Sequence, residues 1–263
     1  MSTLRGRIIA VTRDPGQAAG LCEALRARGA EPLPCPTVAF APPGSWDEVD
    51  AALADWPRVA WVLFPSANAV TFFLDRAAGR LSGPAAWTGK RVGAVGEATR
   101  RLLEARGITV DVVPARFTGA DLAAELIAGQ PVPAGTAVIP TSDIGREELA
   151  EALAAAGWTI RQVTAYRTVP AVPTVEALGR LPQADAVTFA SPSAVKGFAA
   201  AAGADFFRRH PGVAAVSIGP STTRALAALA PATVREASPH SAEGLVQALE
   251  ALFAPPTAGC HSR

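Results

Sequence analysis

The feature that most constrains this chain is the alternation of short apolar runs with amphipathic helical patterns. Six runs are rich in Val, Ile or Phe and too short to be helices, so we interpret them as buried parallel strands. They span residues 7–12, 60–65, 91–95, 136–140, 186–190 and 213–218. Between them leucines recur at i and i+4, as in Leu21/Leu25 and Leu149/Leu153, which is typical of a helix with one buried face. This alternation predicts an α/β fold.

The chain also repeats itself at a nearly constant spacing. Residues 64–70 match 189–195 at an offset of 125, 95–99 match 218–222 at 123, and 13–29 match 141–157 at 128. Such a repeat predicts two copies of one α/β unit. The order of the segments leaves open which of them fold together.

Two segments have the character of connections between the copies. Residues 34–40 and 162–169 are extended in composition, and prolines follow each of them. Proline pushes its neighbours toward extended geometry. We therefore expect these segments to form a two-stranded hinge between domains.

Small and hydroxylated residues gather where four strands are expected to give way to helices. In open parallel sheets, ligands bind outside the carboxyl ends of the strands. Helix N-termini there offer unpaired N–H groups and a positive dipole end to carboxylates or phosphates. Ordinary N-capping would use the same residue types. The candidate ligand-binding residues are Ser66, Asn68, Gly96, Thr99, Ser191, Ser193, Gly219, Ser221 and Thr222. We expect the twin copies to present these turns to each other across a cleft that suits a large, flexible polyanion.

One aromatic residue stands apart from this pattern. Tyr166 is the only tyrosine in the chain and lies in the second extended segment. Its phenol could donate a hydrogen bond or a proton to a ligand. The alternative is a tyrosine packed at a domain junction with its hydroxyl satisfied. The acidic residues Asp14, Asp143, Glu97 and Glu243 are interpreted as helix-start carboxylates rather than as an acid/base pair.

Composition and missing motifs exclude several classes of function. The formal net charge of +1 disfavours a nucleic-acid partner. Three cysteines without a CxxC fit a reducing compartment, no apolar run is long enough for a membrane span, and no signal sequence is visible. We therefore expect a cytoplasmic protein. No GxGxxG or P-loop motif follows a strand, and the three histidines lack the neighbours of a metal site.

Six segments, in order, resemble the uroporphyrinogen-III synthase family. Residues 64–70 are similar to that family's F-T-S-x-N-A-V, with Pro65 in place of the usual threonine. The others are 11–13, 95–99, 165–168, 189–193 and 218–222, and the likeness extends from about residue 8 to residue 252. The resemblance implies two flavodoxin-like domains with parallel sheets, joined by a two-stranded hinge ladder. It assigns residues 1–38 plus 173–254 to the first domain and 39–172 to the second. From their composition and terminal position we expect residues 255–263 to form a disordered tail.

The resemblance also implies a reaction. The substrate would be hydroxymethylbilane, a linear tetrapyrrole with eight carboxylates. Loss of water gives an electrophilic azafulvene, the far pyrrole attacks through its substituted carbon, and the spiro intermediate rearranges to uroporphyrinogen III with ring D inverted. The family implies no cofactor and no metal, and we expect a monomer that binds neither nucleic acid nor a membrane.

The same resemblance gives roles to individual residues. Tyr166 occupies the position of the family's candidate acid. The hydroxyl- and glycine-bearing turns would bind the substrate's carboxylates, with Arg13, Arg146 and Lys196 as charge partners. Each of these cations could equally be a solvated residue at a helix end.

Two other interpretations remain open at this point. Two similar lobes with a hinge also describe a regulatory protein that binds a small molecule without catalysis. Such regulators often carry a DNA-binding helix-turn-helix domain, for which we expect no room after residue 252. A flavin- or nucleotide-binding domain pair is the weaker alternative.

Overall fold

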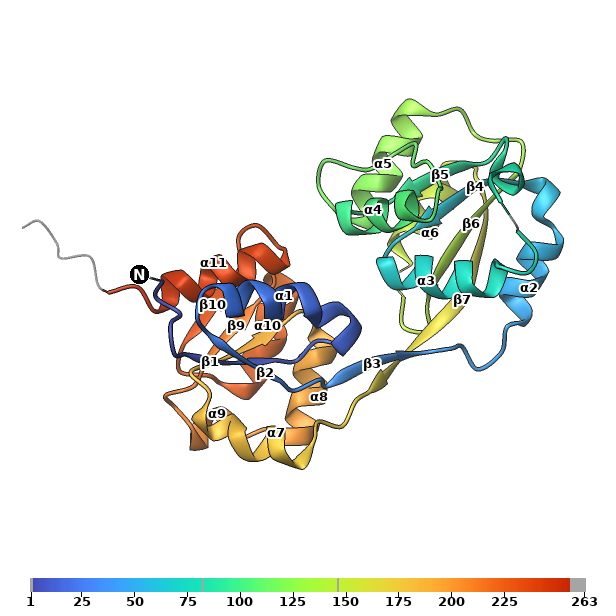
Figure 1. Ribbon diagram of the computed structural model, residues 1–263. Helices are drawn as coiled ribbons and strands as arrows, with labels where there is room; N and C mark the ends of the chain where they lie inside the picture. Colours follow the sequence, from blue (N-terminus) through green and yellow to red (C-terminus); the bar gives the residue numbers. More distant parts are fainter. Residues whose placement is uncertain (1, 82, 146, 256–263) are drawn as a thin grey trace, which may run out of the picture. The chain divides into compact units, whose positions relative to one another are not determined.

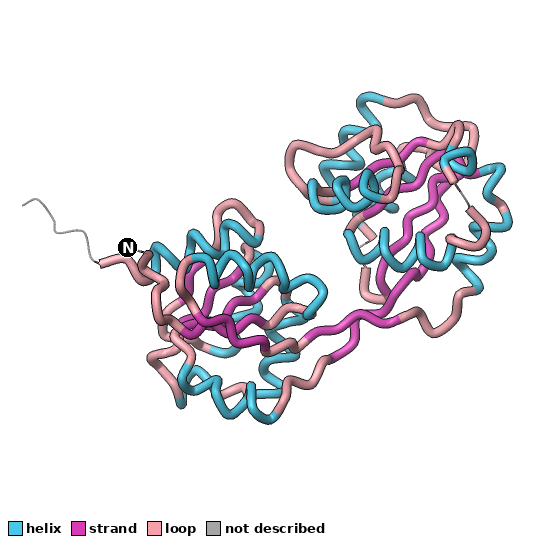
Figure 2. Tube along the Cα trace, viewed as in Figure 1, coloured by secondary structure: helices cyan, strands magenta, loops and turns pink. Residues whose placement is uncertain are grey.

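The computed structural model describes residues 2–81, 83–145 and 147–255. The chain divides into two compact units, each with its own five-stranded sheet (Figure 1). Unit 1 comprises Met1–Ala39 and Val169–Arg263, and unit 2 comprises Phe40–Thr168. Helices and strands alternate along the chain in both units (Figure 2). The predicted fold class, an α/β protein with two domains and largely parallel sheets, is confirmed.

Unit 1 is built on a sheet of strand order β10-β9-β8-β1-β2, in which neighbouring strands are parallel. Its strands are β1 (Ile8–Val11), β2 (Glu31–Pro34), β8 (Ala186–Phe189), β9 (Ala214–Ser217) and β10 (Val234–Glu236). Its helices are α1 (Pro15–Ala27), α7 (Val175–Arg180), α8 (Pro192–Ala202), α9 (Phe206–Arg209), α10 (Pro220–Leu226) and α11 (Ala242–Leu252). Every residue of β8 and β9 is buried, as expected of strands covered on both faces.

Unit 2 has the strand order β3-β7-β6-β4-β5. Its strands are β3 (Val38–Ala41), β4 (Val59–Phe64), β5 (Arg91–Ala94), β6 (Thr136–Ser142) and β7 (Thr159–Pro170). Its helices are α2 (Asp47–Ala54), α3 (Ala67–Ala77), α4 (Glu97–Ala105), α5 (Gly119–Gly129) and α6 (Glu148–Ala155). Strands β3 and β7 are neighbours, and the division between the units falls within both of them, so this pair is the predicted hinge.

Alternation along β4 explains how unit 2 holds two cores. Val62 and Phe64 pack among the side chains of α3 and α4, whereas Trp61 and Leu63 pack among those of α5 and α6. Successive side chains of a strand point to opposite faces of the sheet. Because both faces are covered by helices, the strand is apolar at every position rather than at every second one.

The sequence repeat corresponds to a repeat in three dimensions. At the offsets of the repeat, β9 corresponds to β5, β8 to β4 and β1 to β6. The order β9-β8-β1 in the first sheet is therefore repeated as β5-β4-β6 in the second. Helix α1 packs beside α11 as α6 packs beside α5, and α8 beside α10 as α3 beside α4. The repeated helix ends agree as well, since Gly29 and Gly157 take φ values of +78° and +89°, a conformation that favours glycine.

Two strands were not predicted from the sequence. Strand β2 reads Glu-Pro-Leu-Pro, and its two prolines conceal it, although it lies at the edge of the sheet, where proline is tolerated. Strand β10 has three residues, all exposed, and so carries no apolar pattern. The predicted segment 34–40 is not one continuous strand, because β2 ends at Pro34 and β3 begins at Val38.

Candidate active site

The pocket that best fits a chemical role lies in unit 2, at the carboxyl ends of β4, β5, β6 and β7. Its volume is about 370 Å³. This is the edge of a parallel sheet at which ligands are expected. The lining residues are Pro65, Ser66, Val95, Phe117, Thr118, Gly119, Thr141, Ser142, Ile144, Gly145, Glu148, Leu149, Tyr166 and Thr168. Six of these described residues bring a hydroxyl group, and Glu148 alone among them carries a formal charge at neutral pH.

Two of the predicted residues meet directly in this pocket. The hydroxyl oxygens of Ser66 and Tyr166 are 3.1 Å apart, a hydrogen bond in which either can donate. Ser66 also caps α3, since its Oγ accepts from the backbone N–H of Ala69 at 3.1 Å. The Ser66 hydroxyl therefore caps the helix and, at the same time, contacts Tyr166 in the pocket.

Tyr166 is held by aromatic neighbours within unit 2. Its ring stacks on that of Phe72 at 5.5 Å between centroids and meets the edge of Phe40 at 5.7 Å. The residue is only 7% exposed. The ring is therefore fixed in the core, and the residue also lines the pocket, with its hydroxyl bonded to that of Ser66, which suits a group that must hold one orientation.

The prediction that Asp143 is a helix-start carboxylate is wrong. Asp143 lies after β6, and α6 begins only at Glu148. Its backbone N–H donates to the carbonyl of Tyr166, and its carboxylate accepts from the backbone N–H of Thr168 at 2.9 Å. A register shift between Thr141 and Ser142 produces this arrangement. Asp143 thus holds the backbone that follows Tyr166, from the Tyr166 carbonyl to the Thr168 N–H.

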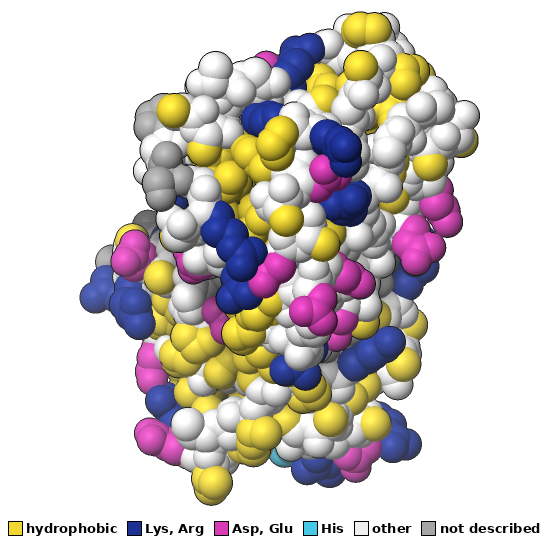
Figure 3. Space-filling model, turned by 90° about the vertical axis from the view of Figure 1, so that its right-hand side faces the viewer, with side chains coloured by type: hydrophobic (Ala, Val, Ile, Leu, Met, Phe, Trp, Pro, Cys, Tyr) yellow, Lys and Arg dark blue, Asp and Glu magenta, His cyan; other side chains and the backbone are white. Residues whose placement is uncertain are grey.

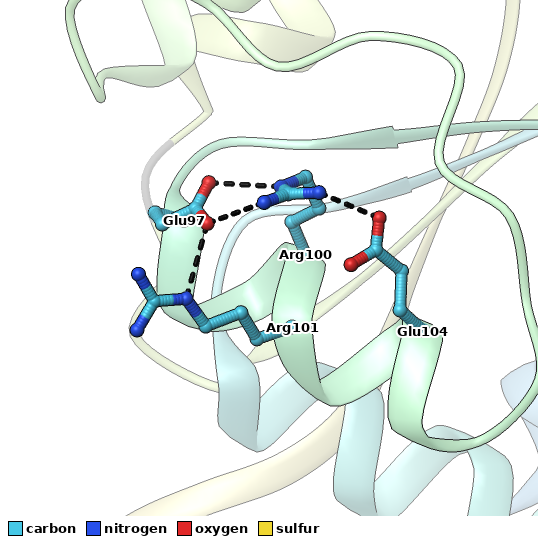
Figure 4. Close-up of polar contacts among 4 residues, drawn as sticks. All are labelled: Glu97, Arg100, Arg101 and Glu104. Carbon is cyan, nitrogen blue, oxygen red and sulfur yellow. Dashed lines mark hydrogen bonds and ion pairs between the residues drawn. The ribbon is translucent and has the colours of Figure 1, made fainter.

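At the turn after β5, ion pairs take the place of the side-chain hydroxyl that caps the helix after β4. Gly96 is the N-cap of α4, and Glu97 in its first turn binds Arg100 and Arg101 (Figure 4). Arg100 also pairs with Glu104 at 2.7 Å. Hydrogen bonding to Arg100, and then to Arg101, lowers the pKa of Glu97 to about 2. Thr99 on the same helix is 5% exposed.

Unit 1 gathers predicted residues at the carboxyl ends of β1 and β8. Ser191 caps α8 by accepting from the N–H of Ala194 at 3.1 Å, as Ser66 does in unit 2. Ser193 lies in the first turn of that helix, and Lys196 on it is exposed. Arg13 follows β1, which is the neighbour of β8 in the sheet.

Arg13 is the one side chain of the described residues with a buried nitrogen or oxygen that lacks a hydrogen-bond partner. The atom is its Nε, while Nη2 donates to the side chain of Gln17 at 3.3 Å. Burial lowers the pKa of Arg13, and the nearby Asp14 opposes that shift. A partly buried guanidinium with an unsatisfied Nε–H is suited to receive an anion.

The turn after β9 is more enclosed. Gly219 is the N-cap of α10, Ser221 is half-buried, and Thr222 is 1% exposed. The neighbouring Thr223, which the sequence analysis did not single out, hydrogen-bonds Ser217, Glu236 and the carbonyl of Gly219. Thr222 is therefore a packed residue of unit 1.

The other predicted residues lie at the beginnings of helices or outside the described part of the chain. Asn68 lies in the first turn of α3 and Ser66 at its cap, both half-buried. Asp14 caps α1, while Glu97 and Glu243 lie in the first turns of α4 and α11, as predicted. The candidates Arg146 and the tail 256–263 lie outside the residues that the structure describes.

Several residues of the pocket were not predicted from the sequence. Thr141, Ser142, Glu148 and Thr168 line it but were not singled out. The repeat could have revealed the first of these, because Thr141 corresponds to the candidate Arg13 at the offset of 128. The stacking partner Phe72 left no signal, since it follows a helix pattern like that of a core residue.

Within the described residues no three His, Cys, Asp or Glu side chains are grouped so as to hold a metal ion. Across the same residues, no helix is both long enough and apolar enough to traverse a bilayer. On the face shown in Figure 3, Lys and Arg side chains are interspersed with Asp and Glu.

A family profile described as "Uroporphyrinogen-III synthase HemD" matches residues 20–247. A uroporphyrinogen-III synthase from Synechococcus elongatus is 33% identical over 257 residues, which cover 94% of this chain and 96% of the relative. One from Chlorobaculum parvum is 27% identical over 230 residues, covering 84% and 88%.

Solved structures agree with these sequence matches at the level of the fold. Uroporphyrinogen-III synthetase from Helicobacter pylori matches with a TM-score of 0.62 at 17% identity, over 94% of this chain and 99% of that one. A mutant uroporphyrinogen III synthase from Thermus thermophilus matches with a TM-score of 0.57 at 20% identity, over 94% and 98%.

Proposed function

The chain belongs to the uroporphyrinogen-III synthase family, and from that membership we propose how its own residues carry the reaction. It is an enzyme of tetrapyrrole biosynthesis that cyclises hydroxymethylbilane to uroporphyrinogen III, with loss of water and inversion of ring D. The observation that supports our assignment of roles is that Tyr166 lines the pocket of unit 2 beside Ser66, to whose hydroxyl its own is hydrogen-bonded.

We assign the acid role to Tyr166. The hydroxyl of the terminal hydroxymethyl group leaves poorly as hydroxide, whereas a proton delivered to it lets it leave as water. The electron pair comes from the pyrrole nitrogen, which gives the azafulvene. The far pyrrole then attacks through its substituted carbon to form the spiro intermediate. Tyr166 recovers a proton when the rearranged macrocycle loses the ring hydrogen at the new bond.

The pocket hydroxyls would bind the carboxylates of the bilane around the reacting end. The hydroxyl-bearing residues Thr141, Ser142 and Thr168 line it without adding charge. Thr118 lines it too, but its hydroxyl already donates to the carboxylate of Asp121. Neutral donors can bind several carboxylates while still releasing the product. Glu148 would repel a carboxylate, so we propose that it accepts a hydrogen bond from a pyrrole N–H instead.

Two apolar side chains at the same pocket would contact the pyrrole rings. Phe117 and Ile144 both line it, and each is 61% exposed. Large apolar groups left in water beside a polar pocket are typical of a binding surface. Pyrrole faces would cover this apolar area while the ring substituents reach the hydroxyls.

In unit 1 we propose that Arg13 binds a substrate carboxylate. Its buried Nε lacks a partner, and a carboxylate could accept from two guanidinium nitrogens at once. Ser191, Ser193, Gly219, Ser221 and Lys196 lie at the same edge of that sheet and would contribute hydroxyl, amide or charged contacts. Gly96, Asn68, Thr99 and Thr222 belong to the proposed binding turns as well; the side chains of Thr99 and Thr222 are buried, so these two would act through the backbone of their turns.

We further propose that the enzyme works as a monomer in the cytoplasm, without a nucleic-acid partner. The net charge of +1 supports the last point. Nothing in the comparisons favours the alternative of a regulatory protein of the same fold without catalysis.

A coupled assay tests the proposed function. Hydroxymethylbilane is generated in situ, the purified chain is added, and the oxidised products are separated into isomers I and III. We expect isomer III in excess over the isomer I that forms spontaneously. Isomer I alone, from protein shown by circular dichroism to be folded, would refute the enzymatic assignment.

A further inference from the structure

The one tyrosine of the chain is connected to the beginning of a helix through a single hydroxyl. The N–H of Ala69, at the N-terminus of α3, donates to Ser66 Oγ, and Ser66 Oγ lies 3.1 Å from Tyr166 Oη. Since Ser66 already accepts from the helix, its own hydrogen is available to donate. A tyrosine that acts as an acid must direct its hydrogen to the substrate, and its oxygen is then left to accept.

We propose that Ser66 is a positioning residue that donates a hydrogen bond to Tyr166. This deepens the role proposed for Tyr166 and rests on it. The bond turns the phenol hydrogen toward the pocket before the reaction. After the proton has moved to the leaving oxygen, the same Ser66 hydroxyl stabilises the phenolate. The positive end of the dipole of the eleven-residue helix α3 also stabilises the phenolate, through the hydrogen bond from the Ala69 N–H to Ser66.

The other copy of the repeat shows that this arrangement is not a by-product of the fold. Ser191 makes the same cap on α8, but the offset of 128 places Val38 where unit 2 has Tyr166. The offset of 125 places Gly197 where unit 2 has Phe72. At Gly197 an added Cβ would lie 2.2 Å from the carbonyl oxygen of Thr37, so a larger residue has no room there. The stacked and hydrogen-bonded tyrosine therefore belongs to unit 2 alone.

Three contacts explain why a single hydroxyl can set the direction of the phenol. Phe72 and Phe40 fix the plane of the ring, and Asp143 holds the backbone that follows Tyr166. The remaining freedom is rotation of the O–H about the C–O bond. The Ser66 hydroxyl, 3.1 Å from Tyr166 Oη, can decide that rotation.

Because Tyr166 is the only tyrosine, its Raman spectrum can be assigned without labelling. The intensity ratio of the tyrosine Fermi doublet rises when the phenol oxygen accepts a hydrogen bond and falls when the phenol only donates. We expect the full-length wild-type protein to show an accepting phenol. In Ser66→Ala the ratio should fall, and in Ser66→Thr, which keeps the hydroxyl, it should recover.

Kinetics in the coupled assay provide the second readout. We expect Ser66→Ala to lower kcat for isomer III by about ten- to a hundred-fold, as for a lost hydrogen bond to a developing charge. KM should change little and Ser66→Thr should restore kcat. Ser66→Gly removes the hydroxyl but costs less as a helix cap, so it serves if the alanine variant folds poorly.

Ser191→Ala is the matched control, because it removes the equivalent cap and no bond to tyrosine. It should lower stability as Ser66→Ala does and leave the doublet unchanged. An unchanged doublet in Ser66→Ala, or a doublet that rises, would overturn the proposal, as would full kcat in that variant. A wild-type protein that made no isomer III would refute the proposed function instead, while the Raman result would still test the bond.

Discussion

Each unit of this protein has an aromatic core of its own, and removing one ring should reveal this. Phe73 and Phe198 are equivalent at the offset of 125, and both are fully buried. Phe73 contacts the rings of Trp56 and Phe64, all within unit 2. Phe198 contacts Phe189 and two further rings of unit 1, Phe206 and Phe207, at 5.1 to 5.7 Å.

The expected loss of stability is large in both cases. Truncating a buried Phe to Ala costs about 3–5 kcal/mol, and an aromatic pair is worth about 0.5–1.5 kcal/mol beyond its buried area. Phe198→Ala should therefore lie near the upper end of the range and Phe73→Ala near the lower end. With a urea m-value of about 2 kcal/mol/M, a loss of ~4 kcal/mol lowers the midpoint of the affected unit by ~2 M.

The distribution of tryptophan makes the assay specific to one unit. All five tryptophans lie between residues 46 and 158, hence in unit 2, whereas far-ultraviolet circular dichroism reports both units. Phe198→Ala should shift part of the dichroism transition and leave the tryptophan fluorescence transition in place. Phe73→Ala should shift the fluorescence transition. If Phe198→Ala moved the fluorescence midpoint as far as the dichroism midpoint, the inference of two separate cores would be wrong.

Three further changes have expected outcomes. Glu97→Gln should lower stability at neutral pH, and added salt should reduce the difference between variant and wild type. Because the pKa of Glu97 is lowered from 4.5 to about 2, its stabilising effect is present above pH 4.5 and is lost as the pH falls toward 2. Urea titrations across that pH window would measure the loss. Thr222→Met should cost about 1–3 kcal/mol, because Thr222 is 1% exposed and the longer side chain overpacks α10; an unchanged unfolding midpoint would show that the site has spare room. Gly197→Ala should also lower the thermal midpoint, because its Cβ would lie 2.2 Å from the Thr37 carbonyl oxygen; a neutral effect would mean that α8 moves at little cost.

Much of the fold could be predicted from the sequence, because the buried strands are continuous apolar runs and the repeat doubles each signal. Leu122 and Leu245, for example, are both fully buried, as their shared offset predicts. What could not be predicted were the elements without such a pattern. The proline-containing β2 and the exposed β10 carry no periodicity that distinguishes them from loops.

The site was predictable in part for a similar reason. Ser66 and Tyr166 were identified one by one, but their contact depends on an extra residue of β7, Ala165, opposite the Thr141–Ser142 step of β6, and on the packing of Phe72. Asp143 was misassigned because an acidic residue after a strand is also typical of a helix start. Its bonds to the backbone around Tyr166 follow from tertiary structure, which no local pattern encodes.

The central claim is that the Tyr166 hydroxyl supplies the proton for loss of water, and Tyr166→Phe tests it most directly. The variant keeps the ring that packs on Phe72 and Phe40 and loses one hydrogen bond, so the unfolding free energy should fall by only about 0.5–1.5 kcal/mol. The measurement is the rate of isomer III formation in the coupled assay. We predict a decrease of about 10²- to 10⁴-fold, the range for loss of a general acid. Formation of isomer III at the wild-type rate by the folded variant would contradict the account.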